Sequence, residues 1–135
     1  TLPIDPAVRP RIQIGRDIRA HEYLAALAER DGMKAAFLAA LDRDGIDALL
    51  TPTTQTAAIP NEAVDQSTTP AHFTRVFNLL EMCALAVPSG FTTGGLPLSL
   101  QIACRPYDEA TALRIGWAYQ QATDWHRRRP PGFGG

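Results

Sequence analysis

The sequence contains little cysteine, a single lysine, few aromatic residues and no long apolar run. Its two cysteines, Cys83 and Cys104, fit a reducing compartment better than a disulfide scaffold, so we expect the protein in the cytoplasm. No stretch approaches the ~20 apolar residues of a membrane span, and no signal-peptide pattern opens the chain. The first residue is Thr1 rather than Met, which indicates an expressed segment, a cleaved product or a fragment.

The chain also lacks an excess of either charge. Thirteen basic and 14 acidic residues give a net charge of −1. We therefore expect no nucleic-acid partner and no membrane partner. The one basic cluster, Arg127 to Arg129, is typical of a solvated chain end. A hydrophobic fraction of 45% and a charged fraction of 20% over 135 residues are those of one ordinary globular domain with its own core.

Patterns for nucleophilic catalysis are missing too. A Gly-x-Ser-x-Gly motif and a Ser-x-x-Lys pair are both absent, and Lys34 is far in sequence from every serine. Cys83 or Cys104 could pair with a histidine as nucleophile and base, although a buried cysteine is more often a small hydrophobe. The three histidines are scattered, and no glycine-rich loop opens a helix, so we expect no metal and no cofactor.

Two apolar runs in the second half of the chain predict a β-hairpin. Residues 84–88 are apolar and stopped by proline, and residues 98–103 alternate apolar and polar side chains at period two. The link, residues 89–97, carries three glycines that let the backbone turn back. Its Thr-Thr-Gly-Gly run could be mistaken for an oxyanion-binding loop, but such glycine pairs are by default turn residues. Residues 46–51 predict a further strand of the same sheet.

Three segments are predicted to be helical, namely residues 18–41, 70–81 and 108–125. Thr69-Pro70 is a typical helix start for the second of them. Residues 53–69 have no period and form a long loop, which is typical of a functional or mobile segment. We find no internal repeat or linker, so residues 1–135 are predicted to form a single α/β unit. The expected buried face of the second helix consists of Phe73, Val76, Phe77 and Leu80.

Several short motifs follow one another along the chain in a fixed order. They are Ile12 to Gly15, His21-Glu22-Tyr23, Arg30, Asp47 to Thr53, Asn78 to Pro88, Ser89-Gly90-Phe91, Gly95-Leu96-Pro97, Gln101 and Asp108-Glu109. Their order and spacing resemble the C-terminal part of the amidase signature family, over nearly the whole chain.

The resemblance implies an α/β fold in which a short mixed sheet with a β-hairpin is packed by about three helices. It also implies hydrolysis of a carboxamide to a carboxylate and ammonia through a serine acyl-enzyme. The family's serine, second serine and lysine lie in a Gly- and Ser-rich signature and an upstream strand, and no residue of this chain matches them. We therefore expect the parent protein to be an amidase, with no catalytic residue in this chain and no activity of this chain alone.

The resemblance also points to a binding site. In the family, the loop after the Thr-Pro-Thr strand lines the acyl-side pocket, so Thr53, Thr54 and Gln55 are the candidate residues for binding a small amide substrate. The alternative is that these side chains only cap backbone groups of a turn.

The sequence departs from the family pattern in two regions. Glu81 stands where many members have glycine, and Cys83 where many have proline. As the resemblance goes, the glutaminase subunit of the tRNA-dependent amidotransferase has an acidic residue a few places before the position that corresponds to Asn78 of this chain. This chain has Ala71, His72 and Phe73 there, which disfavours that branch of the family.

Two hypotheses of different class follow. In the first, the chain is the C-terminal fragment of an amidase domain and supplies its core and pocket wall. In the second, it is a free-standing, non-catalytic domain that binds a partner on the same scaffold. Because the strands are short and apolar and would continue into a larger sheet, we expect the isolated chain to self-associate through an exposed strand edge.

Overall fold

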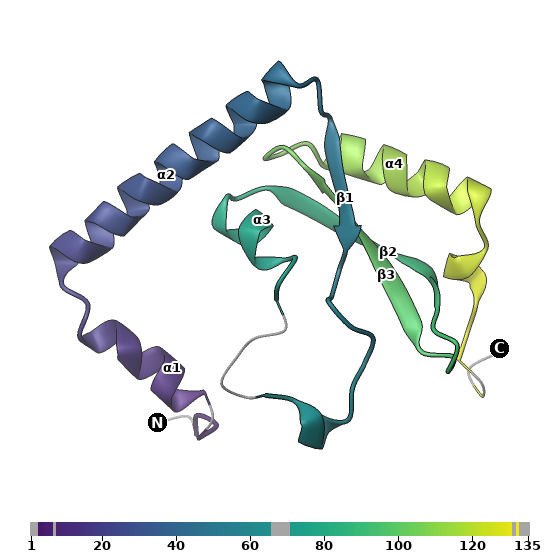
Figure 1. The fold of residues 1–135 in the computed structure, drawn as a ribbon, viewed down its shortest axis with the longest axis horizontal. Coiled ribbons are helices and arrows are strands. Elements are labelled where there is room, and N and C mark those ends of the chain that lie inside the picture. Colours follow the sequence, from purple (N-terminus) through teal and green to yellow (C-terminus); the bar gives the residue numbers. More distant parts are fainter. Residues whose placement is uncertain (1–2, 7, 66–70, 131, 133–135) are drawn as a thin grey trace.

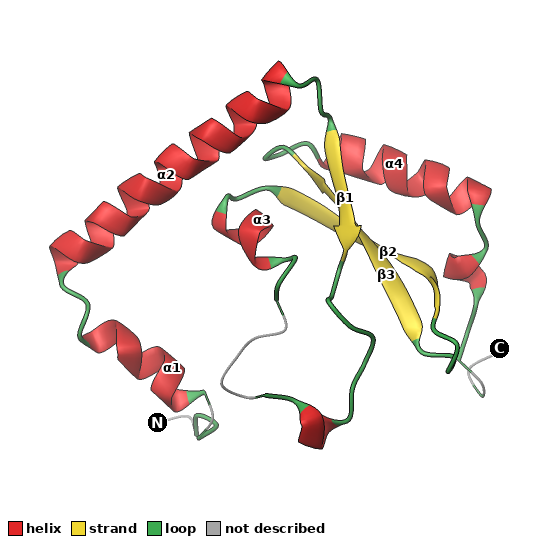
Figure 2. Cartoon of the chain, viewed as in Figure 1, coloured by secondary structure: helices red, strands yellow, loops and turns green. Residues whose placement is uncertain are grey.

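The fold is a three-stranded sheet with helices on both faces (Figure 1). The computed structural model describes residues 3–6, 8–65, 71–130 and 132. The strands are β1 (Ala48–Pro52), β2 (Cys83–Phe91) and β3 (Pro97–Cys104), in the order β1-β3-β2. The α-helices of the described residues are α1 (Arg9–Gln13), α2 (Ala20–Arg43), α3 (Arg75–Leu79) and α4 (Glu109–Ala122). Single 3₁₀ turns occur at Ile14–Arg16, Asn61–Ala63 and Trp125–Arg127 (Figure 2).

The predicted hairpin is confirmed, since β2 and β3 pair antiparallel with Leu85 opposite Ile102. The turn between them is closed by Thr92, whose backbone N–H donates to Leu96 O (2.9 Å) and whose Oγ1 accepts from Leu96 N (3.0 Å). Gly95 takes φ +82° in this turn, a conformation that glycine adopts without a Cβ clash. The Thr-Thr-Gly-Gly run is therefore a turn, as predicted.

The sheet differs from the predicted mixed sheet, because both pairings among the described residues are antiparallel. β1 lies along the other side of β3, with Thr51 opposite Gln101. β3 is thus the central strand, and β1 and β2 are the two edges of this sheet. A mixed sheet needs a parallel neighbour, and the strands of the described residues do not supply one.

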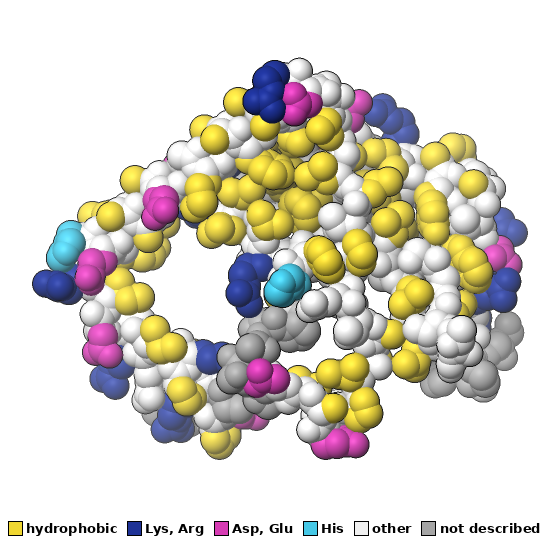
Figure 3. Space-filling model, viewed as in Figure 1, with side chains coloured by type: hydrophobic (Ala, Val, Ile, Leu, Met, Phe, Trp, Pro, Cys, Tyr) yellow, Lys and Arg dark blue, Asp and Glu magenta, His cyan; other side chains and the backbone are white. Residues whose placement is uncertain are grey.

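Alternate side chains of β3 enter two different cores. Ile102 and Cys104 are fully buried in a cluster under α4 with Val87 and Ala112. Ala103 points to the other face, where the end of α2 and α3 contribute Leu41, Phe77 and Leu80 among other side chains. Figure 3 shows apolar side chains gathered where the end of α2 meets the sheet. This alternation is what period two in residues 98–103 predicted.

The three predicted helices exist, with shifted ends. The first ends at Arg43 and is followed by Gly45 at φ +64°, with Ile46 N donating to Leu41 O (2.8 Å). This 6→1 hydrogen bond and left-handed glycine make a standard helix stop. The last helix begins after Asp108, whose carboxylate accepts from Thr111 N (3.3 Å).

The second helix is shorter than predicted. α3 covers only Arg75–Leu79, and the predicted start at Thr69-Pro70 lies outside the described residues. Phe77 and Leu80 are buried as expected, whereas Val76 is 40% exposed. The spacing of apolar residues indicates which face is buried, but it does not fix how many turns form.

The N-terminal arm stands away from the sheet (Figure 1). It comprises α1 and the first half of α2, and large apolar side chains lie exposed along it. They are Ile12, Ile14, Ile18, Tyr23 and Leu24. No helix among the described residues is long and apolar enough to cross a membrane.

Candidate functional site

The three predicted substrate-binding residues lie in the turn that directly follows β1. The first of them, Thr53, is held against β3 by two hydrogen bonds to Ser99. Its backbone N–H donates to Ser99 O (3.0 Å), and its Oγ1 donates to Ser99 Oγ (2.8 Å). Thr53 is therefore tied to the sheet through both of its donors.

The next two residues face outward from this tie. The hydroxyl of Thr54 donates to Thr56 O (2.7 Å), a hydrogen bond typical of a turn, and Gln55 is exposed. Both line a cavity of about 410 Å³, and Thr53 does not. The structure thus places Thr54 and Gln55 on one wall of the cavity, formed by residues 54–57. Thr53 is the residue that fixes this wall to β3.

The cavity beside this wall has an uncharged lining. Its floor is formed by apolar side chains of β1 and β3, including Leu50, Pro52, Leu98 and Leu100. Hydroxyl and amide groups come from the wall and from Ser89 and Ser99. Because no Asp, Glu, Lys or Arg among the described residues contributes to it, the cavity offers apolar contact with neutral hydrogen-bonding groups.

Gln101, quoted above only as part of the family resemblance, was not predicted to support this site. Gln101 is only 4% exposed, and its Nε2 donates both to Thr51 Oγ1 (3.1 Å) and to Phe73 O (3.1 Å). Thr51 precedes the wall, and Phe73 leads into α3. A polar residue inside an otherwise apolar strand is a signal of such a link, since buried polar groups are hydrogen-bonded in native structures.

Three groups that could act as nucleophile or base are engaged in other contacts or buried. Lys34 Nζ lies 2.7 Å from Glu81 Oε2, and Ser99 Oγ accepts the hydrogen bond from Thr53. Cys104 is fully buried, and this burial raises the pKa of its thiol to about 11. Cys104 therefore has the features of an inert core cysteine rather than a nucleophile. Among the described residues, no group of His, Cys, Asp or Glu side chains could hold a metal ion.

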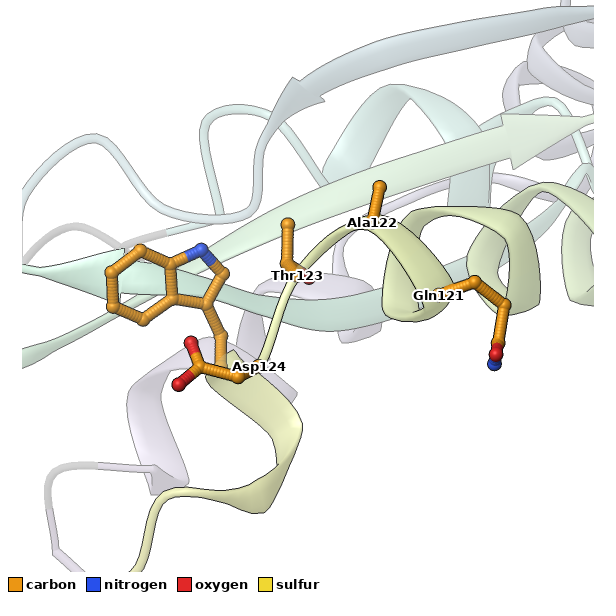
Figure 4. A pocket seen from close by; sticks show the side chains of 5 residues that line it. Gln121, Ala122, Thr123 and Asp124 are labelled. Atoms are coloured by element: carbon orange, nitrogen blue, oxygen red, sulfur yellow. The ribbon is translucent and has the colours of Figure 1, made fainter.

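A second cavity, of about 440 Å³, lies at the end of α4 (Figure 4). Figure 4 shows Thr123 and Asp124 beside it, where the chain leaves the helix. The ring of Trp125 packs edge to face against Phe91. The guanidinium of Arg128 lies 5.0 Å from the centroid of the Trp125 ring, and its Nη2 lies 3.1 Å from Asp124 Oδ2. These contacts attach the segment after α4 to the end of β2, and none of the predicted site residues lies here.

Comparison with known proteins identifies the family. The model of the Amidase family matches residues 2–113. The chain belongs to the amidase family. Among solved structures, a crystal structure of an amidase is 28% identical and covers 87% of this chain, with a TM-score of 0.72. The chain spans 29% of that amidase. The 6-aminohexanoate cyclic dimer hydrolase covers 95% of this chain with a TM-score of 0.79, and at 19% identity this match supports the amidase fold alone.

The curated relatives of this chain include subunits of an amidotransferase. The A subunit of glutamyl-tRNA(Gln) amidotransferase from Chloroflexus aggregans is 40% identical over 133 residues, which is 93% of this chain. The same subunit of Synechococcus sp. (strain JA-2-3B'a(2-13)) is 36% identical over 140 residues. The chain spans only 27% and 26% of the length of these two relatives.

Proposed function

We propose that this chain is the C-terminal part of an amidase domain that hydrolyses carboxamides to carboxylate and ammonia through a serine acyl-enzyme. The observation that carries the proposal is the family match over residues 2–113 in a chain that spans about a quarter of its relatives. The chain itself has no assignable nucleophile and base. It supplies the core and one wall of the acyl pocket, and the catalytic groups belong to the remainder of the protein.

The lining of the 410 Å³ cavity supports an uncharged acyl group as the substrate portion bound here. Leu50, Leu98 and Leu100 offer apolar surface, while Thr54 and Gln55 offer neutral donors and acceptors. Glutamine, whose amide is in its side chain, also carries an ammonium and a carboxylate group. These charges need partners when they are desolvated, and this wall provides none among the described residues.

The proposal is tested by ammonia release from the intact protein that contains this chain, with hexanamide, benzamide and glutamine as substrates. We expect turnover of the two uncharged amides. Hydroxylamine should divert the reaction to the corresponding hydroxamate, because it intercepts an acyl-enzyme. The chain alone, residues 1–135, should release no ammonia above buffer. Failure of the intact protein to hydrolyse any amide would leave the non-catalytic binding domain as the better hypothesis.

A second candidate function is the glutaminase subunit of a tRNA-dependent amidotransferase. The identity of 40% to one subunit of a glutamyl-tRNA(Gln) amidotransferase favours it. The absence of an acidic residue at Ala71, His72 and Phe73 disfavours it. The two candidates differ in substrate: the glutaminase subunit would release ammonia from glutamine, whereas the amidase would release it from uncharged amides. A cytoplasmic location stays a prediction under both.

A further inference from the structure

We propose that Gln101 is the positioning residue of the pocket wall. Its amide holds the start of the wall through Thr51 and the approach to α3 through Phe73, and so sets which acyl groups the pocket accepts. The anchoring is a property of the fold, whereas the selectivity rests on the proposed amidase function.

The geometry accounts for both hydrogens of the Gln101 amide nitrogen. An NH₂ group has two donors. One lies toward Thr51 Oγ1 and the other toward Phe73 O, each with a donor–acceptor distance of 3.1 Å. The two acceptors lie 50 and 28 residues away in the sequence. A single side chain on the central strand therefore joins two segments that are far apart in the sequence.

The burial of Gln101 makes these bonds costly to lose. With 4% exposure, the side chain cannot exchange its partners for water. Removing the donor would leave the part-buried carbonyl of Phe73 without this partner, and an unsatisfied group away from water costs more than the hydrogen bond contributes. A buried apolar residue would pack at this position without linking the segments. The choice of glutamine is explained by the link.

The position of Thr51 gives Gln101 its influence on the wall. Thr51 pairs with Gln101 near the end of the β1–β3 ladder, and Pro52 is the last residue of β1. The next tie is the pair of bonds from Thr53 to Ser99. Beyond the backbone pairing of β1 with β3, the wall that carries Thr54 and Gln55 is therefore attached by two side-chain ties, one from Gln101 to Thr51 and one from Thr53 to Ser99. Loss of one attachment should let the wall move relative to the cavity floor.

The test uses the intact protein that contains this chain, with hydrogen exchange followed by mass spectrometry. In Gln101→Leu, we expect amide exchange to rise about tenfold in residues 53–57 and in residues 71–74, the order of magnitude that loss of one net hydrogen bond allows. Exchange in the β2–β3 pairing should stay unchanged. Thr51→Val should loosen residues 53–57 only, and the matched Thr51→Ser, which keeps the hydroxyl, should behave as the wild type.

The kinetic readout separates positioning from a general loss of structure. With aliphatic amides from acetamide to hexanamide, we expect Gln101→Leu and Thr51→Val to raise KM several-fold for the longer acyl groups. The value of kcat should change less than twofold, and Thr51→Ser should restore the wild-type KM. If Gln101→Leu does not fold, the Thr51 pair alone still tests the link.

Several outcomes would overturn the proposal. Exchange that rises throughout the β2–β3 pairing, or equal behaviour of Thr51→Ser and Thr51→Val, would mean that Gln101 only contributes to global stability. A local rise in exchange with an unchanged order of acyl preference would remove the claim of selectivity. A wild-type protein without amidase activity would refute the proposed function and the selectivity, while the exchange pattern would still decide the anchoring.

Discussion

Lys34 Nζ lies 2.7 Å from Glu81 Oε2, although the two residues are 47 positions apart in the sequence. Arg30, one helical turn earlier in α2, places its Nη1 3.1 Å from the other carboxylate oxygen. Glu81 takes φ +56° directly after α3, and Met82 N donates to Phe77 O (2.9 Å). This is the helix-stop position that favours glycine. Glu81, which stands where many family members have glycine, therefore adopts a backbone conformation that is less favourable for it than for glycine, and it forms an ion pair with α2 that glycine could not form.

Substitutions at Glu81 should separate these two effects. We expect Glu81→Ala to lower the urea midpoint of unfolding most, because it loses the carboxylate and keeps a left-handed residue with a Cβ. Glu81→Gly loses the same carboxylate but relaxes the backbone, so its midpoint should lie between those of Glu81→Ala and the wild type. A Glu81→Gly midpoint at or below that of Glu81→Ala would contradict this account.

The same ion pair predicts an acid-sensitive stability. The hydrogen bond from Lys34, together with the charge of Arg30, lowers the pKa of the Glu81 carboxyl in the folded chain. Because the pKa of Glu81 is lower in the folded chain than the value of about 4.3 in the unfolded chain, the ionised carboxylate stabilises the fold above about pH 4.3. This stabilisation is lost as the pH falls through the folded-state pKa. Thermal melts between pH 7 and pH 3 should show a shallower acid decline in Glu81→Gln. Asp44, whose pKa is lowered by Arg43, should retain its own share of the decline in that variant.

The parts of the fold that depend on local patterns could be predicted from the sequence. The period-two pattern correctly predicted the two faces of β3, and Gly45 marks the end of α2. The short α1 was not predicted, because the prolines of residues 3–10 favour an extended chain, whereas Pro10 is tolerated in the first turn of this helix. The link from Gln101 to Thr51 and Phe73 could not be predicted, since it depends on how the chain between them folds back. A polar residue in an apolar strand indicates that a partner exists, but not which one.

Two glycines in helices should respond in opposite directions to alanine. A Cβ on Gly116 of α4 would lie 2.6 Å from Leu85 Cδ2, whereas a Cβ on Gly32 of α2 would meet nothing within 4 Å. We expect Gly116→Ala to cost about 1–3 kcal/mol of unfolding free energy through overpacking, less the gain in helix propensity. Gly32→Ala should gain up to about 1 kcal/mol. Urea titrations of both variants test this, and a stabilised Gly116→Ala would mean that Leu85 moves aside freely.

The two cysteines should differ in reactivity toward a disulfide reagent such as Ellman's reagent. With a pKa of about 11, Cys104 is thiolate in only about one molecule in a thousand at pH 8. Burial slows its reaction further, so we expect one thiol, Cys83, to react in the native chain and the second only after unfolding. Two results would revive the hypothesis of a cysteine nucleophile. One is rapid labelling of Cys104 in the native Cys83→Ala variant. The other is amide turnover by the chain that is lost in Cys83→Ala or in Cys104→Ala.

The isolated chain should associate through its exposed strand edges and its N-terminal arm. β1 and β2 are the edges of the described sheet, and edge strands carry backbone groups that can pair with another chain. Leu50 on β1 is 58% exposed and Phe91 on β2 is 43% exposed. The arm adds Ile14 and Leu24, at 67% and 63%. Burial of such apolar surface favours association.

Light scattering of residues 1–135 over a range of concentrations should therefore give a mass above that of one chain, increasing with concentration. The matched substitutions Leu50→Lys and Leu24→Lys distinguish the two surfaces, because a lysine on an edge strand blocks pairing whereas a lysine on the arm blocks only apolar contact. We expect Leu50→Lys to lower the mass more if the sheet edge is the contact. A strictly monomeric wild-type chain at all concentrations would mean that the edges are protected within these residues. It would also weaken the proposal that the sheet continues into a larger amidase domain.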